Sequence, residues 1–260
     1  HLFPIKDFST NSLEKSFNTL KQLEKVKNTK IIINGNKIEG IFQRRVNRFI
    51  AEVMINDKIE ITHVANTGRM KELLLPGAKV ILRKVKEAHR KTEYDLLMVY
   101  KDDILVSIDS KLPNYLLHKA FNNRAIDYFK EYDNVRKEIT FRKSRFDFYM
   151  ENEKSSALIE AKCVTLVKEN KLATFPDAKT ERGRKHVREL IEAKRQGFRA
   201  AVFFIIQRSD AIEFTPNKDM DSAFAEAVEL AQKSGVEFYA YNCNVKPDYI
   251  ELNKEIKVII

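Results

Sequence analysis

Cysteines and glycine-rich motifs are scarce in this chain, and each absence excludes a class of protein. The only two cysteines, Cys163 and Cys243, form neither a disulfide framework nor a zinc-ligand spacing. The five histidines are scattered, again without the spacing of metal ligands. No phosphate-binding P-loop, Rossmann glycine fingerprint or Gly-x-Ser-x-Gly motif is present, so nothing supports an NTPase, a dinucleotide enzyme or a serine hydrolase.

Long apolar runs are also absent. No stretch approaches the length of a membrane span, and the amino end does not have the pattern of a signal peptide. Because two isolated cysteines are typical of a reducing compartment, the sequence predicts a cytoplasmic protein with no membrane association.

The charge balance is basic. Lys and Arg total 47 against 37 Asp and Glu, which gives a formal net charge of +10 and a pI near 9.4. An excess of this size attracts polyanions through long-range potential and counterion release. It does not by itself distinguish DNA from RNA or acidic lipid.

The first half of the chain predicts a small barrel. Residues 1–30 are polar, with apolar side chains at helical spacing, which predicts a helical extension. Residues 31–109 contain short alternating runs, predicted as strands over 37–43, 49–55, 58–64, 78–84 and 94–100. Five strands with a short helical turn at 70–75, between the third and the fourth, are the order of an OB-type barrel. A different small barrel with the same strand count is the alternative.

The second half has the pattern of an α/β domain. Helices are predicted from Pro113 onward, over 183–196 and over 222–234, and strands over 135–141, 145–150, 157–164, 200–206 and 237–241. This order over residues 110–245 predicts an α/β sandwich with a mixed sheet. The domain boundary is expected near residues 109–113, and residues 246–260 are expected to form a C-terminal tail.

One predicted strand pair carries the residues of a metal site. Leu-Ile-Glu-Ala-Lys occurs at 158–162 and again at 190–194. The second copy falls in a helix, where residues two positions apart point about 200° apart. The first falls in a strand, where Glu160 and Lys162 share a face, and Asp147 precedes them on the hairpin partner. Two such carboxylates can hold a hard divalent cation, and a lysine beside them can offset phosphoryl charge or position a water. The alternative is a surface ion pair.

Basic residues downstream of this pair offer phosphate contacts. Thr180 can cap a helix whose amino end suits a phosphate, flanked by Arg182, Arg184 and Lys185. Further along, Arg188 and Arg195 fall within about 40° of Arg184 on one stripe. A solvated charged face is the alternative. His186 lies near the core edge, and a structural histidine is favoured over a catalytic one because no nucleophile is paired with it.

The first domain has a basic cluster of its own. It lies between the first two predicted strands and consists of Arg44, Arg45 and Arg48. OB barrels bind nucleic acid through strand faces and loops, with aromatic rings stacking on bases. Candidate rings are Phe42, Phe49 and Tyr94, with burial as the alternative. Arg69, in the turn at 66–70, is a further candidate DNA contact, and a plain structural turn is its alternative.

Four stretches resemble the sugar fermentation stimulation protein A family. They are Arg45-Val-Asn-Arg-Phe49, Asn66-Thr-Gly-Arg-Met-Lys-Glu-Leu-Leu-Leu-Pro-Gly-Ala78, Ser144-Arg-Phe-Asp147 with Glu160-Ala-Lys-Cys-Val-Thr-Leu166, and Phe175-Pro-Asp-Ala-Lys-Thr-Glu-Arg-Gly-Arg-Lys-His186. The resemblance covers about residues 37–245, and the first 30 or so depart from it. It implies an OB-like domain, a PD-(D/E)XK-like domain and DNA binding, with Asp147, Glu160 and Lys162 at the metal and catalytic positions.

The leading hypothesis is a two-domain DNA-binding protein with a nuclease site that depends on Mg²⁺ or Mn²⁺. Asp147 and Glu160 would bind the ion with the carbonyl of Ala161 as a third ligand, and Lys162 would act on the attacking water and the phosphate. The rival hypothesis is a non-catalytic DNA-binding regulatory protein whose acidic pair survives as structure. The strandedness of the DNA and a homodimeric state are left open by the sequence.

Overall fold

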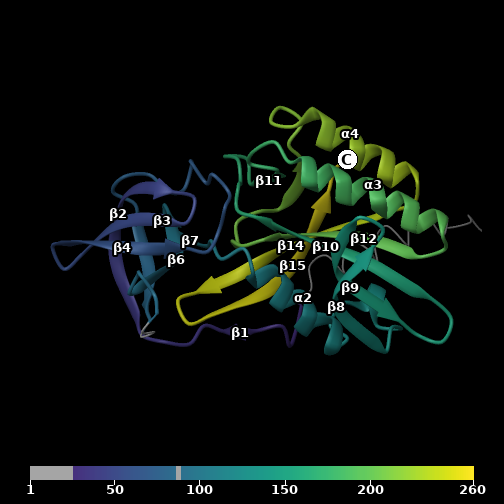
Figure 1. Ribbon diagram of the computed structural model, residues 1–260, viewed down its shortest axis with the longest axis horizontal. Helices are drawn as coiled ribbons and strands as arrows, with labels where there is room; N and C mark the ends of the chain where they lie inside the picture. The colour runs from purple at the N-terminus through teal and green to yellow at the C-terminus, as the bar shows by residue number, and fades with distance from the viewer. Residues whose placement is uncertain (1–25, 86–88) are drawn as a thin grey trace, which may run out of the picture.

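The computed structural model describes residues 26–85 and 89–260. The predicted helical extension lies outside this range up to residue 25, and residues 26–30 have no helical structure. Figure 1 shows a barrel on one side and a larger α/β domain on the other. Within the described ranges, no helix is long and apolar enough to cross a membrane.

The barrel is built from six strands: β2 (Lys37–Asn47), β3 (Ile50–Ile55), β4 (Lys58–Val64), β5 (Lys79–Lys84), β6 (Tyr94–Lys101) and β7 (Ile104–Ser107). They follow the order β4-β3-β2-β5-β6-β7, and a parallel β4–β6 pairing closes the first five into a barrel. Asn56 and Asp57 both have positive φ, at 47° and 61°, as a tight two-residue hairpin turn requires. The predicted OB-type order is therefore confirmed.

Two of the three rings proposed to stack on bases are buried in this barrel. Phe42 is 1% exposed and Tyr94 8%, because alternation along β2 and β6 turns them toward the core, and only Phe49 is exposed. Burial therefore excludes base stacking for Phe42 and Tyr94.

The α/β domain surrounds a nine-stranded mixed sheet. Its strands are β1 (Ile31–Ile32), β8 (Asn134–Phe141), β9 (Ser144–Glu151), β10 (Ser156–Val164), β11 (Leu172–Phe175), β12 (Arg199–Ile206), β13 (Glu213–Pro216), β14 (Glu237–Lys246) and β15 (Tyr249–Val258). The order is β11-β13-β15-β14-β12-β10-β9-β8, with β1 paired to β15. The neighbours β10, β12 and β14 run parallel, and seven of the eight β12 residues are buried.

Helices cover both faces of the sheet (Figure 1). The helices α3 (Glu181–Arg195) and α4 (Ser222–Lys233) pack on one face, where Val187 and Phe224 meet Phe204 of β12. On the other face, α2 (Leu112–Asn122) and the short 3₁₀ helix Asp127–Phe129 contact Phe203 of the same strand. This arrangement confirms the predicted α/β sandwich.

The predicted C-terminal tail is wrong. Residues 249–258 form β15, which pairs with β14 on one side and β13 on the other. The alternation of Ile250, Leu252, Ile256 and Val258 marks this strand, but Lys254 interrupts it and the segment is rich in charge. Residues 31–32 also belong to this sheet rather than to the barrel, because β1 pairs with β15. The short strands β11 and β13 were not predicted.

The two domains are joined by direct hydrogen bonds. The Ser107 N–H donates to the Gln207 carbonyl at 3.0 Å, and the Gln207 side-chain amide donates to the Asp109 carbonyl at 3.0 Å. Farther along the interface, the Met70 N–H donates to the Asp177 carboxylate at 3.1 Å. The barrel turn that begins at Asn66 therefore lies against the segment leading into α3.

Candidate active site

The three predicted catalytic residues lie where two paired strands separate. β9 and β10 pair from Glu151–Ser156 to Phe148–Ile159. Beyond this paired stretch, the Ala161 N–H of β10 is bonded by the Asp147 side chain instead of by the backbone of β9. Asp147 Oδ2 accepts this N–H at 2.7 Å. The strand pair thus delivers Asp147 directly beside the segment that carries Glu160 and Lys162.

A local irregularity in β9 turns Asp147 toward this gap. Phe146 and Phe148 would share one face of a regular strand, yet they lie in the cores on opposite sides of the sheet. Opposite Asp147, the β8 residue Glu138 has a φ of 57°, and the ladder skips both residues. β9 therefore changes face at Asp147, so its side chain points along the sheet rather than into either core.

The Asp147 carboxylate is held by two donors but carries an unfavourable charge. Asn114, in the first turn of α2, donates to Oδ1 at 2.6 Å, and the Ala161 N–H occupies Oδ2. Burial, with a further contribution from the negative charge of Glu160, raises the pKa of Asp147 to about 6. The two carboxylates therefore interact electrostatically.

Glu160 is the most buried member of the site. It is 4% exposed, and its Oε1 accepts from Lys162 Nζ at 2.6 Å and from His186 Nδ1 at 2.5 Å. Burial alone would raise its pKa, but Lys162 and His186 outweigh burial and hold the pKa below its ordinary value. Its Oε2 is buried and has no hydrogen-bond partner among the described residues. One oxygen of a charged, buried carboxylate is thus left without compensation.

His186 reaches this site from α3. The helix begins after Thr180, whose hydroxyl accepts the Gly183 N–H at 3.0 Å, as predicted for its cap. His186 is 4% exposed, so burial agrees with the structural histidine that the sequence favoured. Its contact with Glu160 was not predicted, and neither was the contact between Asn114 and Asp147. Both partners come from helices far from the strand pair in sequence.

The atoms available to bind a cation at this site are oxygens. Across residues 26–85 and 89–260, no three His, Cys, Asp or Glu side chains converge to hold a metal. A cation here would be bound by Asp147 and Glu160 together with a backbone carbonyl. The Ala161 C=O meets this need, because the N–H and C=O of one strand residue point to the same side and its N–H faces Asp147. Two carboxylates and a carbonyl fit Mg²⁺ or Mn²⁺ and leave room for waters or phosphate oxygens.

Comparisons with known proteins place the chain in a family. Residues 44–108 match the model of the SfsA N-terminal OB domain, and residues 111–249 match that of the sugar fermentation stimulation protein RE domain. The chain belongs to the sugar fermentation stimulation protein family. The resemblance noted in the sequence is therefore confirmed.

This chain aligns with nearly the whole length of its relatives in the family. A sugar fermentation stimulation protein homolog from Alkaliphilus metalliredigens is 62% identical over 230 residues, which are 88% of this chain and 99% of the relative. A homolog from Clostridium botulinum is 48% identical over 229 residues, with the same coverage. The structure of Pyrococcus furiosus SfsA in complex with Ca²⁺ has a TM-score of 0.81 at 30% identity and covers 88% of this chain and 98% of its own.

The basic cluster of the SfsA-type OB domain divides into residues with different environments. Arg44 pairs with Glu52 through two hydrogen bonds of 2.8 and 2.6 Å. The Arg45 guanidinium binds the carbonyls of Asn66, Gly68 and Arg48, each within 2.6 Å. Arg45 thus holds the turn at 66–70, and its predicted contact with DNA stays a prediction. Arg48 and Arg69 are exposed.

The predicted phosphate stripe on α3 is partly occupied by protein contacts. Arg182 Nε lies 3.5 Å from His186 Nε2, and Lys185 Nζ donates to the Lys143 carbonyl at 2.5 Å. Arg184 lies 3.9 Å from Glu181, and Arg195 lies 3.6 Å from Glu192. Arg188 is exposed. Of these five residues, Arg188 is therefore the one for which no protein contact is found within residues 26–85 and 89–260.

Two cavities border the site or the basic OB surface. One, of about 350 Å³, lies between the domains and is lined by Lys162, Asp177 and the turn at 66–70, among others. The other, of about 580 Å³, lies on the OB surface beside Arg48, Arg69 and Lys71.

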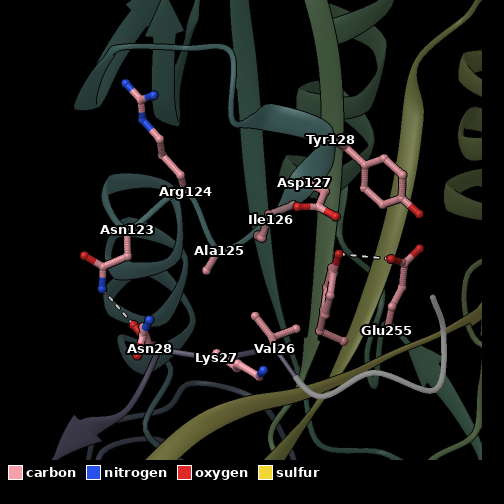
Figure 2. Close-up of a pocket in the computed structure, with 11 residues that line it drawn as sticks. Val26, Lys27, Asn28, Asn123, Arg124, Ala125, Ile126, Asp127, Tyr128 and Glu255 are labelled. Carbon is pink, nitrogen blue, oxygen red and sulfur yellow. Dashed lines mark hydrogen bonds between the residues drawn. The ribbon is translucent and has the colours of Figure 1, made fainter.

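A third cavity, of about 320 Å³, is shown in Figure 2 and contains none of the predicted site residues. Its polar groups bond to one another: Asn123 donates to the Asn28 carbonyl at 2.7 Å, and Tyr241 donates to Glu255 at 3.1 Å. This cavity therefore does not contribute to the candidate site.

Proposed function

We propose that this chain binds DNA and hydrolyses phosphodiester bonds with Mg²⁺ or Mn²⁺ at Asp147, Glu160 and Lys162. The observation that carries the proposal is the unpaired Glu160 Oε2, a buried charged oxygen of a carboxylate that interacts with the half-buried carboxylate of Asp147. Unpaired buried charge is costly unless a partner or a metal compensates it. A divalent cation bound through Oε2 would provide that compensation.

A relative supports the chemistry of the cation. The P. furiosus structure named above contains SfsA in complex with Ca²⁺. Calcium and magnesium are both hard ions that prefer oxygen ligands, although Mg²⁺ keeps more of its waters and often binds substrate phosphates. The carboxylate pair of this chain suits such an ion.

The residues of the site would have separate roles in hydrolysis. A bound Mg²⁺ or Mn²⁺ would supply Lewis-acid charge to a phosphoryl oxygen and to a water. The water oxygen forms the new bond to phosphorus, the P–O ester bond breaks, the leaving oxygen gains a proton, and the water loses one to solvent. The Lys162 ammonium, 2.6 Å from Glu160, would place positive charge beside the phosphate. Asn114 and His186 hold the two carboxylates in place.

Cleavage of circular single-stranded DNA, and of supercoiled plasmid, which exposes unpaired segments, tests this proposal. Wild-type protein should cleave with Mg²⁺ or Mn²⁺ and stop with EDTA. Glu160→Gln should lose cleavage because the ligand charge is removed, and Glu192→Gln on the outer face of α3 serves as the matched control. Cleavage that persists in Glu160→Gln or in EDTA would contradict the assignment.

A non-catalytic DNA-binding regulatory protein is the second candidate. It is favoured by the two donors, Lys162 and His186, that already occupy Glu160 Oε1. Under this alternative the plasmid stays intact, no divalent cation raises the melting temperature, and DNA binding is unchanged by Glu160→Gln.

A further inference from the structure

We infer that the strand cut at this site is single-stranded DNA, led to Lys162 through a groove that runs from the OB domain into the interface between the domains. The inference deepens the proposed function and rests on it for the cleavage step. The route itself stands on two cavities that share residues.

The first part of the route is cationic. The cavity of about 580 Å³ on the OB surface is lined by Arg48, Arg69 and Lys71, with no acidic residue in its wall. All three side chains are exposed. Proteins that bind single strands without base pairing combine such a charged groove with contacts along the phosphate backbone. This cavity has the charge for that task.

The second part leads to the candidate catalytic lysine. The interdomain cavity of about 350 Å³ is lined by Lys162 and Lys179 and shares Thr67 and Gly68 with the first cavity. Thr67 is exposed and lies at the junction. A DNA phosphate backbone bound along Arg48, Arg69 and Lys71 therefore reaches Lys162 by crossing only the protein turn at 66–70.

The size of the interdomain cavity excludes a base-paired helix. A volume of about 350 Å³ is that of a small-ligand pocket, on the order of one nucleotide. Enzymes that act on a nucleotide in so small a pocket require an unpaired strand or must extrude the nucleotide from the duplex. An unpaired DNA strand can follow this route without the free-energy cost of breaking base pairs.

The turn at 66–70, which separates the two cavities, is held by hydrogen bonds from both domains. Arg45 binds three carbonyls around the turn, Asn66 Oδ1 accepts the Gly68 N–H at 2.8 Å, and Asp177 accepts the Met70 N–H at 3.1 Å. A Cβ at Gly68 would lie 3.0 Å from Asn66 Oδ1 and 3.1 Å from Asp177 Oδ2, so the turn and the second domain are closely packed. Because residues of both domains hold this turn, it forms an ordered wall between the two cavities.

Competition binding tests the route without cleavage. Labelled single-stranded and blunt duplex oligonucleotides of equal length are measured with Ca²⁺ and again with EDTA. We expect the single strand to bind at least 10-fold more tightly. Thr67→Trp, which fills the junction, should weaken single-strand binding about 10-fold or more, and Thr67→Ala should bind as wild type does.

The outcomes separate this inference from the proposed function. Equal binding of duplex and single strand, or Thr67→Trp binding like Thr67→Ala with an unchanged melting temperature, overturns the route even if plasmid is cleaved. A single-strand preference that Thr67→Trp removes supports the route even if no cleavage occurs, in which case only the catalytic proposal fails. With Mg²⁺, a cut in the overhang of a partial duplex and not in a blunt duplex supports both.

Discussion

At the residue scale, the site is defined by a surplus of buried negative charge. Asp147 and Glu160 interact, and Lys162 and His186 neutralise one oxygen of Glu160 while leaving the other unpaired. Within the part of the chain that the structure describes, the hydrogen-bond partners of Asp147 are the Asn114 amide and the Ala161 N–H, neither of which is cationic. Its charge state therefore controls both the stability of the metal-free protein and the capacity to bind a cation.

Asp147 should make the stability of the metal-free protein depend on pH. Its pKa rises from 3.8 to about 6 in the folded state. The folded protein thus holds this proton more tightly than the unfolded chain does. The contribution is fully present below pH 3.8 and is lost as pH rises through about 6, a difference of about 3 kcal/mol. Asp147→Asn should remove this loss, so urea melts of variant and wild type should agree near pH 4, diverge as pH rises to about 6, and stay apart above pH 6 in favour of the variant.

The matched control for this prediction is Asp219→Asn, because the Asp219 side chain is 91% exposed. It should follow the wild-type profile at every pH. Wild type and Asp147→Asn with parallel profiles from pH 4 to 8 would show that the Asp147 charge is not destabilising.

Lys162 should separate cation binding from cleavage. Lys162→Met keeps the length of the side chain and removes its charge, and Lys162 is not a ligand of the cation. We expect Mg²⁺ to raise the melting temperature of the variant as it does for wild type, while plasmid cleavage falls roughly 100-fold or more. Lys162→Arg retains the charge and should recover part of the rate. Wild-type cleavage by Lys162→Met would remove the lysine from the mechanism.

The strand residues of the site could be predicted from the sequence, and their helical partners could not. Alternation alone places Glu160 and Lys162 on one face of a strand and excludes the second Leu-Ile-Glu-Ala-Lys copy. Asn114 and His186 arrive through tertiary packing, which no local spacing encodes. The only local signal for His186 is the capped, basic segment that precedes it.

At the element scale, prediction succeeded where periodicity was strong. β12 is a continuous apolar run and α3 has an apolar stripe with a Thr cap, so both were recognised. β11 and β13 have four residues each, too few to establish a period. β15 has ten residues, but a lysine breaks its alternation, and it was taken for a tail.

The position of β15 predicts that it is essential for folding. Ile250 and Leu252 are fully buried, and the strand is bonded to β1, β13 and β14. Deleting residues 249–260 should abolish cooperative thermal unfolding, because three neighbouring strands and part of each core lose their partner. Deleting residues 259–260 alone should leave a cooperative transition within a few degrees of wild type. A soluble, cooperatively melting protein without residues 249–260 would contradict this role for β15.

At the scale of the whole molecule, the two domains share one surface. The turn at 66–70 and the segment before α3 were singled out separately in the sequence, yet 107 residues separate Met70 from Asp177, and their contact is visible only in the fold. Arg45 supports this contact, because its Nη1 and Nη2 donate to the carbonyls of Gly68 and Asn66 in the turn that meets the second domain. The exposed cations that remain, above all Arg48 and Arg69, lie on the same groove.

The salt dependence of DNA binding should identify the surface that is used. For a single strand, the slope of log K against log salt is about −0.7 per phosphate contact. Replacing Arg48, Arg69 and Lys71 together by Ala should therefore make the slope shallower by about 2, with little dependence on base sequence. The Arg184→Ala and Arg188→Ala double variant measures the α3 stripe in the same way, and a change of about 1.4 would assign both residues to phosphate contacts. Lys233→Ala, at an exposed position on α4, measures the change in slope for one lost charge away from both surfaces, and the correction is three times this value for the first set and twice this value for the second. If neither set changes the slope beyond this control, DNA binds elsewhere on the protein; if only the first set does, the OB groove is the phosphate path and α3 is not.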